Sequence, residues 1–184
     1  MRGDNTRSLT VIISPLQSLM KDQVDQLQAS GVAATFLNST LSEKEARARL
    51  SGLHRGHYKL LYAAPERLML DGWVENLKTW NVTCIAIDEA HCISQWGYDF
   101  RPAYLEIGKI RDTFPELPIM ALTASATPKV QKDIQEKLGL RSKNIFHASF
   151  VRSNLSFSVF ETENKGGKIL EVLQAVLKQL LEAL

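Results

Sequence analysis

The sequence predicts an α/β protein built on a parallel, doubly wound sheet. Short apolar runs rich in β-branched residues alternate along the chain with segments whose apolar residues recur at helical spacing. This alternation is typical of a parallel sheet with helices on both faces. Functional loops of such sheets lie at the carboxyl ends of the strands. Three predicted strand ends carry hydroxyl or acidic residues: Ser14-Pro15, Asp88-Glu89 and Thr123 to Thr127.

The predicted strands are apolar runs closed by turn-forming residues. The first is closed by Ser14-Pro15 and the third by Pro65. The predicted strands cover residues 9–13, 33–37, 58–63, 82–87 and 119–123, and a strand-like alternation follows at 157–160.

The predicted helices have recognisable ends. Gly31 ends the first helix, Ser42 and Glu45 stand in the capping-box relation, and Pro128 occupies a first turn of a helix that stops at Gly139. The predicted helices run from 16 to 31, 42–53, 71–80, 102–113, 128–138 and 168–184.

Length and composition bound the function classes. A chain of 184 residues predicts one domain with at most a stub of a second. The net charge of +2 excludes a histone-like binder, so any nucleic-acid surface is a local patch. Cys84 and Cys92 are predicted to be reduced thiols, and no zinc-ligand spacing is present. No apolar run reaches the roughly 20 residues of a membrane span, and the polar start lacks a signal core.

The most informative segment is the apolar strand that ends in Asp88 and Glu89. A buried parallel strand delivers both carboxylates to the open end of its sheet. Asp88 can hold Mg²⁺ through its water shell, and Glu89 can orient or deprotonate the water that attacks a γ-phosphate. The alternative is an acid pair at a helix N-terminus, which the helix dipole favours. The apolar strand before the pair and His91 after it favour the hydrolytic interpretation.

An aromatic loop follows the acid pair. Trp96, Phe100 and Arg101 are suited to stacking on unpaired bases and to pairing with phosphate. The alternative is that Trp96 and Phe100 are core side chains, since aromatic residues are usually buried. A base-stacking surface one loop from a hydrolytic site predicts a motor that moves on a nucleic acid.

A hydroxyl-rich turn is the third candidate segment. Thr123, Ser125 and Thr127 can bond His91 or a carboxylate without filling the site. Thr127 also stands where it would cap the helix that begins at Pro128, and both roles are compatible.

Two strand-end turns are candidate phosphate contacts. Ser14-Pro15 leads into a helix that carries Lys21, and Pro65-Glu66-Arg67 follows the third strand. Helix N-termini bind phosphate groups readily. The alternative for each turn is an ordinary solvated helix start.

A phosphate loop ending in Gly-Lys-Ser or Gly-Lys-Thr is missing from the sequence. The nearest string, Gly166-Gly167-Lys168, is followed by Ile169 where a hydroxyl is required. Thr162 stands where the first glycine of the loop is expected. The chain therefore carries the second half of an ATP site without the first.

Taken in order, these segments resemble the first motor lobe of a RecQ-type ATP-dependent DNA helicase, a superfamily 2 member with a RecA-like fold. The resemblance extends from about residue 10 to residue 160. Tyr98 stands where histidine is common in the family's aromatic-rich loop. The matching segments are 14–23 (motif Ia), 64–68 (the next DNA-contacting turn, motif Ib), 88–91 (motif II), 96–101 (the aromatic-rich loop), 123–127 (motif III) and 152–155 (the end of the lobe).

The resemblance implies a helicase that moves 3′ to 5′ on DNA in recombination and repair, in the bacterial cytoplasm at the nucleoid. It implies ATP and Mg²⁺ as cofactors, with no zinc in this part, and single-stranded DNA, duplex junctions and a second lobe as partners. The implied catalytic residues are Asp88 (through Mg²⁺), Glu89 and His91. The implied DNA-binding residues are Ser14, Pro15, Lys21, Pro65, Glu66, Arg67, Trp96, Phe100 and Arg101. The implied coupling residues are His91, Thr123, Ser125 and Thr127.

The resemblance also implies an internal fragment of a longer protein. Residues 1–8 would be a non-native or polar start, 9–162 a truncated RecA-like lobe that lacks the phosphate-loop strand and helix, and 163–184 a linker and amphipathic helix leading toward a second lobe. We expect the chain alone not to hydrolyse ATP, and its incomplete sheet to expose apolar surface.

Two other functions remain open from the sequence. The chain could be a non-catalytic module that binds single-stranded DNA or a partner through its aromatic loop. It could also be an RNA helicase lobe, although the loop at 96–101 disfavours this.

Overall fold

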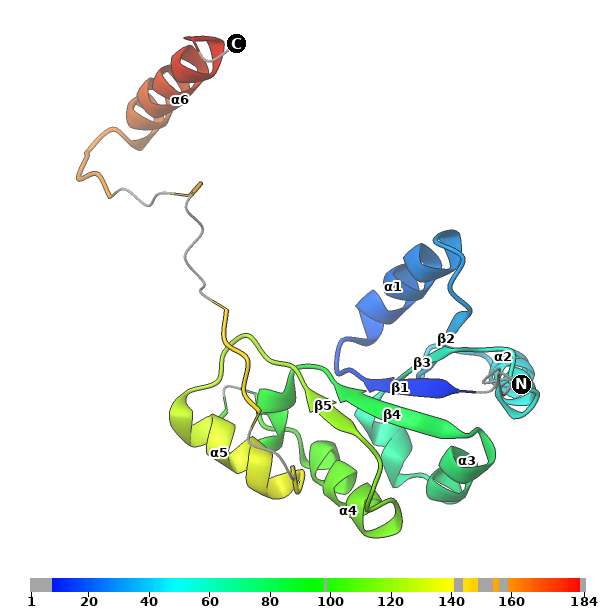
Figure 1. The fold of residues 1–184 in the computed structure, drawn as a ribbon. Coiled ribbons are helices and arrows are strands. Elements are labelled where there is room, and N and C mark those ends of the chain that lie inside the picture. Colours follow the sequence, from blue (N-terminus) through cyan, green and yellow to red (C-terminus); the bar gives the residue numbers. More distant parts are fainter. Residues whose placement is uncertain (1–7, 98, 141–143, 149–153, 156–158, 183–184) are drawn as a thin grey trace, which may run out of the picture. The chain divides into compact units, whose positions relative to one another are not determined.

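A computed structural model describes residues 8–97, 99–140, 144–148, 154–155 and 159–182 (Figure 1). The chain divides into two compact units, residues 1–143 and residues 144–184. Each unit is described by itself.

The first unit is built on a five-stranded sheet in which every pairing is parallel. The strand order is β2-β3-β1-β4-β5. This arrangement confirms the α/β fold with a parallel sheet. The strands are β1 (Leu9–Ile13), β2 (Ala34–Leu37), β3 (Leu60–Ala63), β4 (Val82–Ile87) and β5 (Ile119–Ala121).

Helices connect the strands, and several of the predicted ends are confirmed. Ser42 and Glu45 form the predicted capping box, and Gly31 and Gly139 adopt positive φ angles of 79° and 55° just beyond their helices. The helices are α1 (Gln17–Ala29), α2 (Glu43–His54), α3 (Trp73–Thr79), α4 (Leu105–Thr113) and α5 (Pro128–Lys137). Three short 3₁₀ helices are η1 (Pro65–Met69), η2 (Ala90–Ile93) and η3 (Pro102–Tyr104).

Some predicted boundaries are wrong. The helix expected from residue 102 begins as η3, and the strand expected to end at Thr123 stops at Ala121. Beyond Ala121, Leu122 still donates its N–H to the Ile87 carbonyl and accepts from the Ala90 N–H, and Thr123 then turns its hydroxyl to His91. The strand-like segment at 157–160 lies partly outside the described residues, and Val159 and Phe160 belong to no strand.

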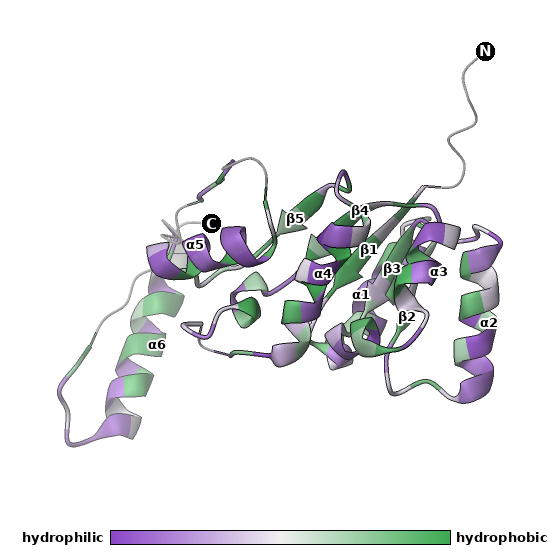
Figure 2. Ribbon diagram, turned by 90° about the horizontal axis from the view of Figure 1, so that it is seen from below, coloured by the Kyte–Doolittle hydropathy of each residue, from purple (hydrophilic) through white to green (hydrophobic). Residues whose placement is uncertain are grey.

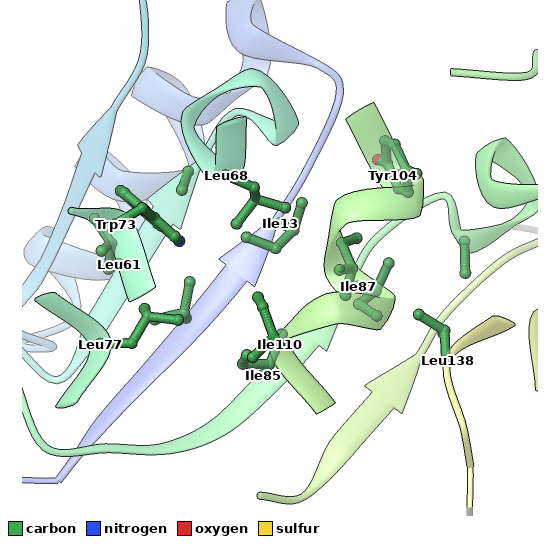
Figure 3. Close-up of a cluster of buried hydrophobic side chains, with 14 of the residues drawn as sticks. Ile13, Leu61, Leu68, Trp73, Leu77, Ile85, Ile87, Tyr104, Ile110 and Leu138 are labelled. Atoms are coloured by element: carbon green, nitrogen blue, oxygen red, sulfur yellow. The ribbon is translucent and has the colours of Figure 1, made fainter. Parts of the chain in front are cut away.

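The sheet separates two hydrophobic clusters. The larger cluster lies between the sheet and α2 to α5, and Figure 3 shows Ile13 and Ile87 of the strands among Leu77 and Ile110 of the helices. The smaller cluster lies under α1, where Met20 and Val24 pack against β2. Figure 1 shows α1 on one side of the sheet and α3, α4 and α5 on the other.

Part of the α1 face of the sheet is open to solvent. The strand register places Tyr62, Ile12, Ala86 and Met120 in one row across β3, β1, β4 and β5. Met120, at the β5 end of this row, is 52% exposed. The sheet therefore exposes apolar surface.

The second unit contains one helix, α6 (Lys165–Glu182), among its described residues. Apolar side chains such as Ile169 and Leu173 are exposed along it, and Figure 2 shows apolar and polar residues alternating along its length. None of the helices in the described ranges is both long enough and apolar enough to span a membrane.

Candidate active site

The candidate site lies at the carboxyl ends of three neighbouring strands. Ser14 follows β1, Asp88 and Glu89 follow β4, and Thr123 comes shortly after β5. Because β1, β4 and β5 are parallel and adjacent, these ends meet at one edge of the sheet. The sheet thus brings together segments that the sequence separates.

Four hydrogen bonds hold Asp88. Its backbone N–H donates to the Ile13 carbonyl at 2.8 Å, and its own carbonyl accepts from the Tyr104 hydroxyl at 3.0 Å. Its Oδ2 accepts from the buried Ser14 hydroxyl at 3.1 Å, and its Oδ1 accepts from the Glu89 N–H at 3.0 Å. The carboxylate is half-buried, so it is oriented by these bonds and still reached by solvent.

Tyr104 supports this arrangement from the core. Its side chain is fully buried, and Figure 3 shows it close to the turn that follows Ile87. Burial raises the pKa of the Tyr104 hydroxyl far above its ordinary value. The hydroxyl therefore stays protonated and remains a donor to Asp88. Sequence reasoning missed this residue, since an apolar-facing tyrosine gives no local signal of a polar role.

Glu89 has an unusual backbone conformation. Its φ of 48° and ψ of 45° lie in the left-handed region, which residues other than glycine seldom occupy. Such strain is found most often at functional sites. The side chain makes no capping bond to η2, and its Oε2 lies 3.2 Å from His91 Nδ1. Glu89 is therefore not a helix-capping acid.

His91 joins the acid pair to the hydroxyl-rich turn. It is buried, and its Nδ1 lies 3.0 Å from Thr123 Oγ1 as well as close to Glu89. The tautomer decides whether Nδ1 donates to the carboxylate or accepts from the threonine hydroxyl. Either way, one ring nitrogen contacts groups from the ends of two strands.

The other hydroxyls of this turn have separate positions. The Thr127 hydroxyl accepts from the Val130 N–H at 3.4 Å and so caps α5. The exposed Ser125 donates its backbone N–H to Thr123 Oγ1 at 3.4 Å. Of the three hydroxyls, only that of Thr123 has a described contact with His91.

The aromatic loop packs directly on η2. A side chain at Gly97 would place its Cβ 2.2 Å from the His91 carbonyl oxygen, so only glycine fits there. Trp96 is 65% exposed, which rules out a core role, whereas Phe100 is half-buried. Two guanidinium nitrogens of Arg101 donate to Asp99 Oδ2 at 2.9 Å. Tyr98 lies outside the described residues.

Helix α5 holds the loop from the other side. Lys129 Nζ lies 3.2 Å from the centre of the Trp96 ring, and Lys137 Nζ donates to the Ile93 carbonyl at 3.1 Å. Asp133 lies between these lysines in the sequence and is 3.2 Å from Lys137 Nζ. Burial opposes ionisation of Asp133, but hydrogen bonds from Ser94 and Lys137 outweigh it and lower its pKa. Sequence reasoning missed all three residues, although their spacing of four is a signal of one helix face.

Of the two predicted phosphate-contacting turns, the first belongs to this site through Ser14, which donates to Asp88, and the second follows β3. Pro15 is buried, and the exposed Lys21 pairs with Asp25 on its own helix. Arg67 donates to the carbonyl of Asn38 at 3.1 Å. Asn38 is buried at the end of β2, and sequence reasoning missed it. The flanking Pro65 is buried in η1. An open pocket of about 440 Å³ is lined by Gln17, Ser39, Ala64, Glu66, Arg67 and Leu70.

The acid pair fits a magnesium ion held mainly by water and phosphate. Within the described ranges, no group of three or more His, Cys, Asp or Glu side chains could form a metal cage. Mg²⁺ commonly keeps several waters and uses one or two carboxylates with substrate phosphates. Asp88 and Glu89 supply carboxylates of that kind, and the sequence supplies no phosphate loop to complete the site.

Comparison with known proteins identifies relatives of this chain. The family model described as DEAD/DEAH box helicase matches residues 2–134. The ATP-dependent DNA helicase RecQ of Bacillus subtilis is 49% identical over 166 residues, which are 90% of this chain and 28% of that protein. RecQ of Haemophilus influenzae is 48% identical over 153 residues, which are 83% of this chain and 25% of that protein.

More distant similarities are also found. The RecQ-like DNA helicase BLM of Xenopus laevis is 40% identical over 164 residues, covering 85% of this chain and 12% of that protein. Among solved structures, the Hef helicase domain of Pyrococcus furiosus matches with a TM-score of 0.49 and 18% identity over 73% of this chain and 28% of that chain. The chain spans about a quarter of the length of its bacterial RecQ relatives.

Proposed function

The chain belongs to the DEAD/DEAH box helicase family and is of the RecQ type, and from this premise we propose that it forms part of an ATP-dependent DNA helicase. The parent protein would move 3′ to 5′ on single-stranded DNA and unwind duplexes in recombination and repair. Its partners would be single strands, duplex junctions and a second motor lobe of the same protein. It would act in the bacterial cytoplasm, at the nucleoid.

One observation carries this proposal: a continuous set of contacts links the acid pair to both neighbouring loops. Ser14 donates to Asp88, Glu89 and Thr123 both contact His91, and the aromatic loop packs on the His91 carbonyl at Gly97. A motor must connect nucleotide hydrolysis to its binding of the nucleic-acid strand. Contacts of this kind provide a route between the two.

The residues would divide the work as phosphoryl transfer requires. Mg²⁺, when bound with ATP, would neutralise the phosphate charge. Asp88 would hold the water shell of the ion, since its carboxylate is oriented by Ser14. Glu89 would orient the attacking water and accept its proton. His91 and Thr123 would transmit the change caused by ATP hydrolysis to the turn at 123–127, which Ser125 and Thr127 complete.

DNA would bind along the side of the sheet where the parallel β-strands have their carboxyl ends. Trp96 and Phe100 would stack on bases, and Arg101 would pair with phosphate after exchanging its Asp99 contact. The sugar–phosphate backbone of the DNA would be contacted by Ser14, Pro15, Lys21 and the turn at 65–67.

Binding of a fluorescently labelled single strand to the 184-residue chain tests the DNA surface. We expect Trp96→Ala to weaken binding roughly tenfold, because a base stack is worth about 1–3 kcal/mol. The control is Phe146→Ala, since Phe146 is 94% exposed and lies outside the aromatic loop. Equal losses in both variants would contradict the proposal. Stronger competition by RNA than by DNA would instead support an RNA helicase lobe.

The purified 184-residue chain should not hydrolyse ATP. Half of the phosphate-binding shell is absent from its sequence, because no Gly-Lys-Ser or Gly-Lys-Thr loop occurs in it. Phosphate release would be measured with and without single-stranded DNA. DNA-stimulated release that Glu89→Gln abolishes would refute this expectation.

A further inference from the structure

Helix α5 presents a charged stripe to the aromatic loop. Lys129, Asp133 and Lys137 follow one another at intervals of four residues, so they share one face of the helix. Lys137 Nζ donates to the Ile93 carbonyl and lies 3.2 Å from Asp133 Oδ2. Lys137, at the C-terminal end of the stripe, therefore fixes the chain at Ile93, just before the aromatic loop.

The first residue of the stripe makes a different kind of contact. Lys129 is exposed, and its ammonium lies over the face of the exposed Trp96 ring, 3.2 Å from its centre. The Trp96 backbone N–H is held by the Ser94 hydroxyl at 3.2 Å. The start of the loop is thus anchored at Ser94, while Lys129 covers one face of a Trp96 ring that is otherwise open to solvent.

This contact competes with base stacking. An indole ring has two faces, and a base that stacks on the face against which the Lys129 ammonium lies must displace that ammonium. Stacking of a base on an aromatic ring is a stronger contact than an exposed cation–π pair. A displaced lysine would remain beside the strand, where a phosphate is the natural partner of its charge.

We propose that Lys129 is a displaceable cover of Trp96, which exchanges the ring for a DNA phosphate when a base stacks there. Lys129 is a positioning residue in this exchange. It lies two residues after Thr127, which caps α5 and ends the turn that contacts His91. The exchange would therefore signal strand occupancy to the hydroxyl-rich turn. This inference rests on the proposed DNA-binding function.

Fluorescence quenching tests the cover without DNA. Of the three tryptophans, Trp73 and Trp80 are only 4% and 3% exposed, so dissolved quenchers reach Trp96. A nearby ammonium attracts iodide and repels caesium. We expect Lys129→Met to lower the ratio of iodide to caesium quenching by about twofold, a shift set by one charge at close range in salt. An unchanged quenching ratio would overturn the proposal that Lys129 covers Trp96.

Salt dependence of binding tests the exchange. For binding of an oligothymidylate to the chain, Lys129→Met should reduce the slope of log K against log salt by about 0.7, the share of one phosphate contact. The matched control is Lys132→Met, because Lys132 lies on the same helix, is 77% exposed and sits 3.7 Å from Glu136. This control should leave both the quenching ratio and the slope unchanged.

The outcomes separate the inference from the function beneath it. Normal binding with an unchanged slope in Lys129→Met would overturn the exchange and leave the DNA surface standing. Equal weakening at every salt concentration would show a merely structural lysine and would also overturn it. Failure of the unaltered chain to bind the strand would instead overturn the proposed function, and the exchange with it.

Discussion

Cys92 shows how the surroundings of one residue decide its chemistry. Its Sγ lies 3.9 Å from His91 Nε2, a pairing that in other settings activates a nucleophile. Here burial, followed by the negative charge of Asp99, raises the pKa of the thiol to about 11. The thiol is therefore neutral at physiological pH, and Cys92 fills space behind His91.

Alkylation of the folded chain tests this assignment. At pH 8, with a pKa of about 11, roughly one Cys92 thiol in a thousand is ionised, and the thiolate is the reactive form. Iodoacetamide should modify the half-buried Cys84 before Cys92, and the Cys92 rate should still be rising above pH 9. Mass spectrometry of timed samples measures both rates. Denaturant should make the two cysteines react alike, and faster modification of Cys92 in the folded chain would contradict the argument.

Glu89 and Gly97 are two further residues whose backbones shape the site. Glu89 turns the chain sharply out of β4, and Gly97 lets the loop return against the His91 carbonyl. The acid pair and the aromatic loop are therefore held together by backbone geometry as well as by side chains.

At the scale of elements, α5 links the aromatic loop to the rest of the unit. It packs against α4 at Gly108, where an added Cβ would lie 2.6 Å from the carbonyl oxygen of Lys137. The same Lys137 bonds Ile93 at the root of the loop. The close approach of the two helices therefore sets the position of the charged stripe.

Gly108→Ala should push these helices apart. We expect the free energy of unfolding to fall by about 1–3 kcal/mol, as for other overpacked sites, because the obstructing atom belongs to the backbone. Chemical denaturation followed by circular dichroism measures the change. Gly166→Ala is the control, since its nearest neighbour would be an Asn164 side-chain atom at 3.8 Å. Equal stability of the two variants would show that α4 and α5 adjust without cost.

At the scale of the whole first unit, the two faces of the sheet are covered unequally. Helices α2 to α5 pack on one face, whereas α1 packs on the part of the other face formed by β2 and β3. Ile12 and Met120 lie on the remaining part, where Met120 is half exposed. Exposed apolar sheet surface favours association between molecules.

Met120→Lys should reduce binding of the dye ANS and slow aggregation of the chain, because it places a charge on the open face. The free energy of unfolding should change by less than about 0.5 kcal/mol, as for most exposed positions. Met69→Lys serves as the control, since Met69 is 62% exposed but lies in η1. If the control lowers dye binding as much as Met120→Lys does, the open sheet face is not the source.

The sequence by itself determined the β-strands of the sheet to within about two residues at each end, most helix ends and the candidate segments of the site. Apolar periodicity, the Ser42 capping box and the acid pair after an apolar strand are local signals, each readable within a few neighbouring residues. Parallel topology then predicted that Ser14, Asp88 and Thr123 would meet at one edge of the sheet.

Only the tertiary structure decided how those segments touch. The left-handed turn at Glu89, the Tyr104 bond to Asp88 and the Lys129 cover of Trp96 follow from no local pattern. The bond from Lys137 to Ile93 joins residues 44 positions apart. Such contacts depend on how whole elements pack in three dimensions, whereas periodicity reports only which face of one element is buried.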